Sequence, residues 1–269
     1  MNGIPSSSVA ARPGGLVGVE LDAYGVPGVA RVTLARPDAF NALSEAMLDE
    51  LQAALDALAK SDAHVVVIAA AGRAFCAGHD LKEMRANPSR DYYARLFARC
   101  SKAMLTIQRM PQPVIARVHG VATAAGCQLV AMCDLAIAAD TARFAVSGIN
   151  LGLFCSTPAV PLTRNVSRKA AFEMLMTGEF IDARTAEREG LVNRVVAVDE
   201  LDTAVAALAA TICAKPRDAV RTGKQLFYRQ LEMGIEAAYQ LAGQTMACNM
   251  IADCAQEGVK AFIERRDAK

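Results

Sequence analysis

The chain has 269 residues, of which 53% are hydrophobic, and it carries 29 lysines and arginines against 28 aspartates and glutamates. This balanced charge provides no field to attract nucleic acid or an anionic membrane surface. No segment has the roughly 20 uninterrupted apolar residues of a membrane helix. We therefore expect a globular protein with a substantial core, and neither nucleic acid nor a membrane as a partner.

The cysteines and histidines do not have the sequence spacing of metal ligands. The eight cysteines form no Cys-x-x-Cys pair, and His64, His79 and His119 have no ligand spacing to one another or to cysteine. A disulfide framework is not expected at this length, so we predict free thiols, a reducing compartment and no metal.

The first fifteen residues are rich in Ser, Ala, Gly and Pro, with Arg12 but no acidic residue. We predict a disordered tail over residues 1–15 and a cytoplasmic protein. The alternative is a weak organelle transit peptide, because such segments are basic and poor in acids. In that case the protein would be mitochondrial.

Strand and helix patterns alternate along most of the chain. β-branched runs predict strands at 28–35, 64–69, 113–119 and 134–139. Apolar residues at helical spacing predict helices at 44–61, from 91 to 107 and within 120–132, and Ser44 is suited to cap the first of them. The alternation predicts an α/β fold with parallel pairing, in which loops at strand ends carry the chemistry.

The pattern changes near residue 199, after which it is helical throughout. The run at 64–69 is almost wholly apolar, which is typical of a strand covered on both faces. We therefore predict an α/β core over 16–198 and a helical C-terminal region over 199–269.

Three segments carry motifs that occur together in one family. They are RAFCAGHDLKEM at Arg73–Met84, GVATAAGCQL at Gly120–Leu129 followed by Cys133 and Asp134, and the stretch from Phe144 to Pro158 with its continuation to Asn193. Jointly they resemble the crotonase (enoyl-CoA hydratase/isomerase) superfamily from about Val29 to the C-terminus. The resemblance implies a ββα spiral core, a C-terminal helical trimerisation region, and a homotrimer or a dimer of trimers. It also implies an acyl-coenzyme A substrate and no separate cofactor.

The resemblance also assigns roles in the site. Reactions of an acyl thioester push negative charge onto its carbonyl oxygen, and loss of one N–H donor from such an oxyanion hole costs about 3 kcal/mol. The two donors would be the main-chain N–H groups of His79 and Ala125. The implied substrate-binding residues are Ala74, Phe75, Ala77, Gly78, Asp80, Leu81, Lys82 and Gly126. Lys82 and Arg36 are either phosphate partners or solvated surface residues.

The chain departs from the family where hydratases use two glutamates, one as acid and one as base. Gln128 and Gly148 occupy those positions, so classical hydration is doubtful. Gln128 either orients a water or a carboxylate or makes an ordinary buried hydrogen bond. Cys155 lacks a visible activating base, so we expect it to pack.

The side chain of His79 leaves two interpretations open. Either only its N–H acts and the ring packs, or the imidazole takes part, because it titrates in a useful range. Three functions follow as hypotheses. The first is an enoyl-CoA hydratase-type lyase or isomerase that relies on the oxyanion hole, the second a decarboxylase of malonyl-type thioesters that uses His79, and the third a non-catalytic acyl-CoA binder.

Overall fold

Two β-sheets frame the protein, which is described by a computed structural model over residues 15–264. The larger sheet has the order β1 (Val17–Glu20), β2 (Val29–Leu34), β3 (Val65–Ala70), β5 (Val114–Val118), β7 (Leu135–Ala139) and β10 (Arg194–Val196). The smaller has the order β4 (Ala74–Cys76), β6 (Val121–Thr123), β8 (Arg143–Ala145) and β9 (Ile181–Asp182). Only the β1–β2 and β8–β9 pairs within these two sheets are antiparallel. The tail predicted at 1–15 lies, except for Gly15, outside the described residues.

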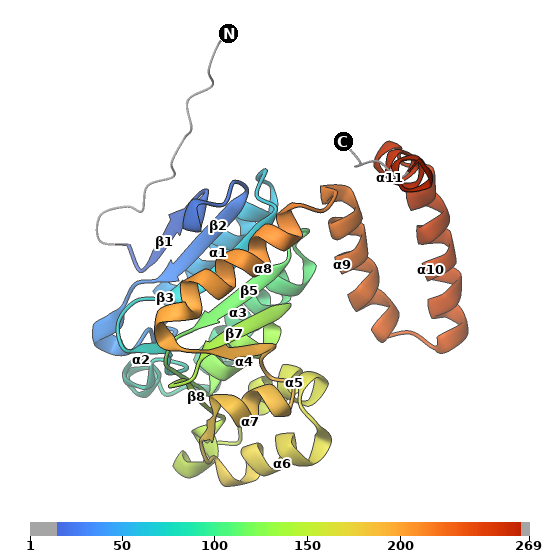
Figure 1. Cartoon of the computed structure of the whole chain (residues 1–269). Helices are drawn as coiled ribbons and strands as arrows, with labels where there is room; N and C mark the ends of the chain where they lie inside the picture. The colour runs from blue at the N-terminus through green and yellow to red at the C-terminus, as the bar shows by residue number, and fades with distance from the viewer. Residues whose placement is uncertain (1–14, 265–269) are drawn as a thin grey trace.

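The chain passes repeatedly from the larger sheet to the smaller and then into helix. β3 and β4 lead to α2 (Leu81–Ala86) and α3 (Arg90–Arg109), β5 and β6 lead to α4 (Ala125–Met132), and β7 and β8 lead through η3 (Ser147–Leu151) to α5 (Ser156–Asn165). The remaining body elements are α1 (Glu45–Ala59), α6 (Arg168–Thr177), α7 (Ala183–Arg188), α8 (Leu201–Cys213), η1 (Ala23–Gly25), η2 (Pro37–Ala39) and η4 (Val198–Glu200). This arrangement confirms the expected crotonase-like ββα spiral (Figure 1).

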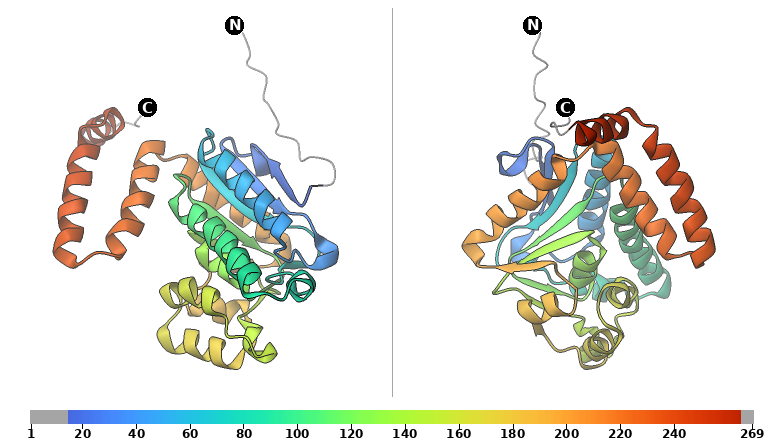
Figure 2. Two further views of the ribbon diagram at one scale, coloured as in Figure 1. Left: turned by 180° about the vertical axis from the view of Figure 1, so that it is seen from behind. Right: turned by 45° about the vertical axis from the view of Figure 1, so that its right-hand side comes forward.

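The larger sheet is covered on both faces. Every residue of β3 is buried. Val66 and Ile68 join the core beneath α1 and α3, whereas Val65 and Val67 join a second core with α8. Figure 2 shows α1 and α3 on one face and α8 on the other. The expectation of a doubly covered strand at 64–69 is therefore confirmed, because successive side chains point to opposite faces.

Several short elements differ from the sequence expectation. β4 and α2 lie between the strand predicted at 64–69 and the helix predicted from 91, where no element was predicted, and β6 lies within 120–132, where only a helix was predicted. β1 has no counterpart among the predicted strands. These strands have three or four residues, too few for alternation to be recognised.

The C-terminal helices form an arm that projects from the body, to which its first helix is joined by side-chain contacts (Figure 1). It consists of α9 (Arg217–Leu231), α10 (Ile235–Met250) and α11 (Asp253–Ile263). α8, which also falls in the range 199–269, packs on the sheet, so the arm begins after it. The arm exposes large apolar side chains, including Phe262 at 86%. Within residues 15–264, every helix is too short or too polar to cross a membrane.

A buried ion pair fastens α9 to the body. Lys224 Nζ lies 2.6 Å from Asp134 Oδ2 and donates to the carbonyls of Ile107 and Gln112 at 2.8 Å each. Tyr228 donates its hydroxyl to the other oxygen of Asp134 at 2.7 Å. Burial lowers the pKa of Lys224, and the Asp134 carboxylate opposes that shift. All three ammonium protons thus have an acceptor within the protein, which compensates for its desolvation.

We expect Lys224→Met to lower the free energy of unfolding by about 3–5 kcal/mol, because it leaves the largely buried Asp134 carboxylate without its cation. Arg164→Met is the matched control. Arg164 pairs with Glu232 at 3.4 Å on the surface, and such pairs contribute less than about 1 kcal/mol. Urea unfolding followed by circular dichroism at one protein concentration measures both. Equal losses for the two variants would contradict a fastening role.

Candidate active site

Two loops from different turns of the spiral meet at Gly78. The backbone of Gly78 has φ +93°, and a Cβ there would lie 2.9 Å from the Ala124 Cβ and 3.3 Å from the Ala125 nitrogen. A side chain is therefore excluded both by conformation and by space. The absence of a side chain at residue 78 lets the loop after β4 approach the start of α4 directly.

The loop after β4 is held from the other side by Leu43. The Leu43 N–H donates to the Gly78 carbonyl at 2.7 Å, and the Asp80 N–H donates to the Leu43 carbonyl at 3.4 Å. Asp80 caps α2 by accepting from the N–H groups of Lys82 and Glu83, and its other oxygen lies 2.8 Å from Arg36 Nη1. Burial acts to raise the pKa of Asp80, but the Arg36 and main-chain hydrogen bonds together lower it. Asp80 is thus a structural anchor of this loop.

The start of α4 is strained and has no side-chain cap. Ala124 precedes the helix with φ 51° and ψ −120°, a conformation that favours glycine, and such strain costs roughly 1–3 kcal/mol. Among the described residues, neither the Ala125 N–H nor the His79 N–H donates to a protein acceptor. Gly126 holds the helix close to β4, since a Cβ there would lie 2.0 Å from the Cys76 carbonyl oxygen. Two free amides therefore flank the contact at Gly78.

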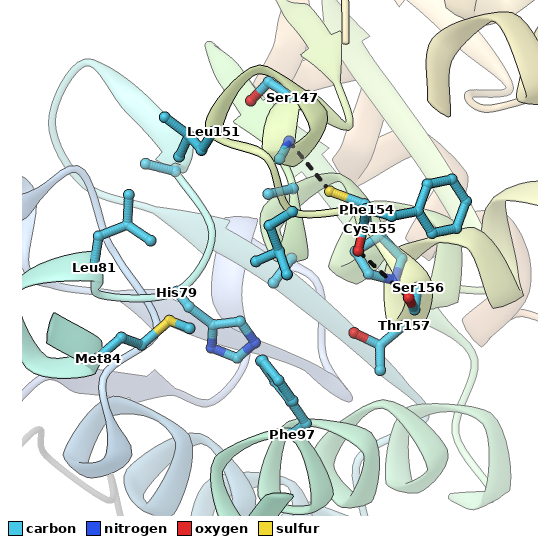
Figure 3. A pocket seen from close by; sticks show the side chains of 16 residues that line it. His79, Leu81, Met84, Phe97, Ser147, Leu151, Phe154, Cys155, Ser156 and Thr157 are labelled. Atoms are coloured by element: carbon cyan, nitrogen blue, oxygen red, sulfur yellow. Dashed lines mark hydrogen bonds between the residues drawn. The ribbon is translucent and has the colours of Figure 1, made fainter. Parts of the chain in front are cut away.

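A pocket of about 290 Å³ opens beside these amides (Figure 3). Its walls are mostly apolar, and none of the described residues lining it is Asp, Glu, Lys or Arg. The lining consists of Ala77, His79, Leu81, Met84, Phe97, Ala124, Ala125, Ser147, Gly148, Leu151, Leu153, Phe154, Cys155, Ser156, Thr157 and Pro158. Apolar walls with few polar groups are typical of a small-molecule site.

The imidazole of His79 lies in this pocket. Its Nδ1 is 3.3 Å from the Leu43 carbonyl oxygen, and its Nε2 is buried with no hydrogen-bond partner among the described residues. The Phe97 ring packs against it at 5.4 Å between ring centroids. Burial lowers the pKa of His79, and the contact with Leu43 partly opposes that shift. The ring is therefore neutral at neutral pH.

Of the two positions that hold glutamate in hydratases, only one lines the pocket. Gln128 is only 4% exposed on α4 and does not line the pocket, and its Oε1 has no partner among the described residues. Gly148 lines the pocket, but a Cβ there would lie 2.6 Å from the Leu153 carbonyl oxygen and 2.7 Å from Cys155 Sγ. The Gly148 N–H donates to that sulfur at 3.3 Å. Burial raises the pKa of the Cys155 thiol, which is therefore neutral.

The remaining candidate residues divide into pocket walls and support. Ala77 and Leu81 line the pocket. Ala74 and Phe75 are buried within β4 and support the loop. Lys82 is exposed on α2. Among the described residues no cluster of three or more His, Cys, Asp or Glu side chains could hold a metal ion.

The apolar walls were missed by sequence reasoning. Phe97 belongs to the predicted apolar face of the 91–107 helix, and Leu153 to an apolar run. Periodicity marks such residues as buried, but it does not separate a pocket wall from the core.

A ββα spiral whose loops after β4 and β6 meet beside an apolar pocket is the architecture of the crotonase superfamily. The sequence matches the model of the enoyl-CoA hydratase/isomerase family over residues 26–269, and the chain belongs to that family.

Individual relatives place the chain within that family. Mouse mitochondrial enoyl-CoA hydratase domain-containing protein 3 is 47% identical over 240 residues, covering 89% of this chain and 80% of the relative. The crystal structure of human enoyl-CoA hydratase domain-containing protein 3 has a TM-score of 0.90 at 44% identity, covering 94% of this chain and 99% of that one. An enoyl-CoA hydratase structure from Mycobacterium smegmatis has a TM-score of 0.92 at 63% identity, with coverage of 94% and 98%. The resemblance that the three sequence motifs indicated is confirmed.

We expect Gly148→Ala to lower the free energy of unfolding by about 1–3 kcal/mol, because the added methyl group meets a backbone oxygen and a sulfur. Gly223→Ala is the matched control, since a Cβ at Gly223 in α9 meets nothing within 4 Å. That change should be neutral or stabilising by up to about 1 kcal/mol. Denaturant unfolding compares the two. An equally mild effect at both positions would show that residue 148 has room for a side chain.

Proposed function

We propose that this protein is an acyl-CoA enzyme that stabilises a thioester enolate between the main-chain N–H groups of His79 and Ala125. The observation that carries this proposal is the pair of unengaged amides beside the Gly78 contact, at an apolar pocket. Ala125 is also the first residue of α4, where a helix presents free N–H groups and partial positive charge. Such preorganised donors act on charge that develops during the reaction.

The substrate of this proposal is an acyl-CoA thioester, with coenzyme A as part of the substrate and no separate cofactor. The apolar walls suit an acyl chain. Gly78 lets the two amides come close together, and Ala77 and Leu81 line the pocket beside them. Lys82, exposed on α2, is available to a phosphate group, whereas Arg36 is engaged by Asp80.

The chemistry proposed is that of a lyase or isomerase with atypical activity. Classical hydration needs an acid and a base about the added water. The described pocket lining offers no carboxylate, Gly148 has no room for a side chain, and Gln128 lies outside the lining. Decarboxylation of a malonyl-type thioester is the second candidate. It is favoured by the His79 ring in the pocket and needs no acid pair, since loss of carbon dioxide itself yields the enolate.

The assembly proposed is a homotrimer or a dimer of trimers. The large apolar side chains exposed on the arm, such as Phe227, Ile235 and Phe262, support burial against other copies. For location, the mitochondrial names of the mouse and human relatives support the mitochondrial alternative over the cytoplasm.

We expect the carbonyl stretch of bound ¹³C-labelled octanoyl-CoA to move to lower wavenumber in the wild type, because two N–H donors polarise the carbonyl. Ala125→Pro removes one donor at the first helical position, where proline is tolerated. About half of the shift should then be lost. Isotope-edited infrared difference spectroscopy measures the shift.

Ile235→Pro is the control, because Ile235 is likewise the first residue of a helix, α10, away from the pocket. It should leave the carbonyl shift unchanged. Its thermal unfolding midpoint shows how much stability a proline costs at the first residue of a helix. A wild type that does not bind the ester, or binds it without any shift, would refute the proposed oxyanion hole. Binding with a shift but no turnover of any thioester would favour the non-catalytic alternative.

Hydration of crotonyl-CoA should be about 10² to 10⁴-fold slower than by a hydratase that has both glutamates, because this is the usual contribution of positioned acid–base groups. The loss of absorbance of the conjugated thioester measures the rate. A dedicated hydratase assayed beside it serves as the reference. Comparable rates would show that other groups replace the glutamate pair.

A further inference from the structure

The proposed function uses only the main-chain N–H of His79 and leaves its imidazole without a role. That ring is nevertheless placed as a reactive group. Its Nε2 is buried and has no partner among the described residues, and the ring lines the pocket beside Met84 and Phe97 (Figure 3). An orphaned buried polar atom in a native protein calls for an explanation, and a catalytic role is one such explanation.

The tautomer of the ring follows from its contact with Leu43. A carbonyl oxygen only accepts hydrogen bonds, so the Nδ1 that lies 3.3 Å from it carries the ring hydrogen. The neutral ring then has a bare lone pair on Nε2. Burial lowers the pKa of His79, so this base form is present without prior loss of a proton.

Charged groups around the ring are already engaged elsewhere. Both oxygens of Asp80 are bound, one by Arg36 and one by main-chain N–H groups. Glu83 on α2 accepts from the N–H of Glu45 at 3.0 Å, and the Glu45 carboxylate pairs with Arg99 of α3 at 3.2 Å.

Across the pocket, the only other titratable side chain in the described lining is Cys155, a neutral thiol. The remaining polar lining side chains are the hydroxyls of Ser147, Ser156 and Thr157, which are poor bases. His79 is therefore the one residue with a side-chain base among the described residues that line the pocket, and Nε2 is the ring nitrogen without a partner.

We propose that His79 Nε2 is the base that removes and returns the α-proton of an uncharged, apolar acyl thioester; this rests on the proposed function. The His79 ring lines the same pocket into which the thioester is proposed to bind beside the His79 N–H. As the Cα–H bond breaks, the proton passes to Nε2 and its electron pair forms the carbon–carbon double bond of the enolate. The negative charge moves to the thioester oxygen between the two amides.

The same step defines a class of reaction. The imidazolium returns the proton to the α-carbon, which amounts to exchange. In a β,γ-unsaturated chain it can return the proton to the γ-carbon instead, which moves the double bond into conjugation with the thioester. No oxidant, water or second substrate is consumed. The inference thus favours double-bond isomerisation over hydration.

The walls favour an uncharged acyl group over the charged malonyl-type thioester of the second candidate function. No lysine or arginine among the described residues lines the pocket, so a carboxylate on the acyl chain would be buried without a cation. The pocket has a volume of about 290 Å³.

The test is α-deuterium uptake by octanoyl-CoA in heavy water, followed by mass spectrometry. The wild type should exchange the α-protons, and His79→Asn should be slower by about 10² to 10⁴-fold. This substitution removes the base but keeps the main-chain donor, and its amide can still reach the Leu43 carbonyl. His64→Asn, just before β3, is the control and should exchange like the wild type.

The pH profile separates a base from a packing residue. Exchange by the wild type should fall in acid as Nε2 becomes protonated. Because burial lowers the pKa of His79, the fall should begin below the ordinary imidazole value. The residual exchange of His79→Asn should lack this inflection. If His79→Asn does not bind octanoyl-CoA, His79→Gln is assayed in the same way.

Undiminished exchange in a folded, ester-binding His79 variant would overturn the inference. So would a wild type that binds octanoyl-CoA and shifts its carbonyl stretch but exchanges no α-proton, and in that case the proposed oxyanion hole would stand. Absence of binding or of the carbonyl shift in the wild type would instead refute the proposed function, and this inference with it.

Discussion

The close approach of Gly78 to the start of α4 is the constraint on which the rest of the site depends. A single methyl group at residue 78 would meet Ala124 and the Ala125 nitrogen, and one at residue 126 would meet the Cys76 carbonyl oxygen. These two contacts bring a loop and a helix from successive turns of the spiral together. The amides of His79 and Ala125 share one pocket because nothing larger than hydrogen stands between the segments.

This arrangement has a local cost that the surrounding fold offsets. Ala124 adopts a strained conformation, and the first amides of α4 lack a side-chain cap. Strain of this kind persists only where the surroundings over-determine the geometry. Leu43 fixes the opposing loop by three contacts, and Arg36 fixes Asp80. The two amides are thus set in place before any ligand arrives, as the proposed stabilisation of developing charge requires.

The chemistry available in the pocket is limited because Gln128 and Gly148 stand where hydratases have two glutamates. Where relatives with hydratase chemistry would carry a carboxylate, the sulfur of Cys155 fills the space beside Gly148, and Gln128 lies behind the wall. The one side-chain base that remains among the described lining residues is the neutral imidazole of His79. A single base in an apolar pocket suits movement of one proton and does not suit the addition of water across a double bond.

The sequence by itself determined the long strands, the doubly covered strand at 64–69, the helical C-terminus and the family, because these follow from periodicity and from contiguous motifs. Only the tertiary structure decided the rest. Strands of three residues are too short to show a periodic pattern. The helix α8 packs against the sheet, although the helical pattern of its sequence continues into the arm. Phe97 lines a pocket, although its spacing marks it as a core residue. Whether residue 148 has room for a side chain, or which ring nitrogen of His79 is free, depends on atoms of Leu153, Cys155 and Leu43. Such contacts join residues that only the folded chain brings together, and no local sequence pattern encodes the distances between their atoms.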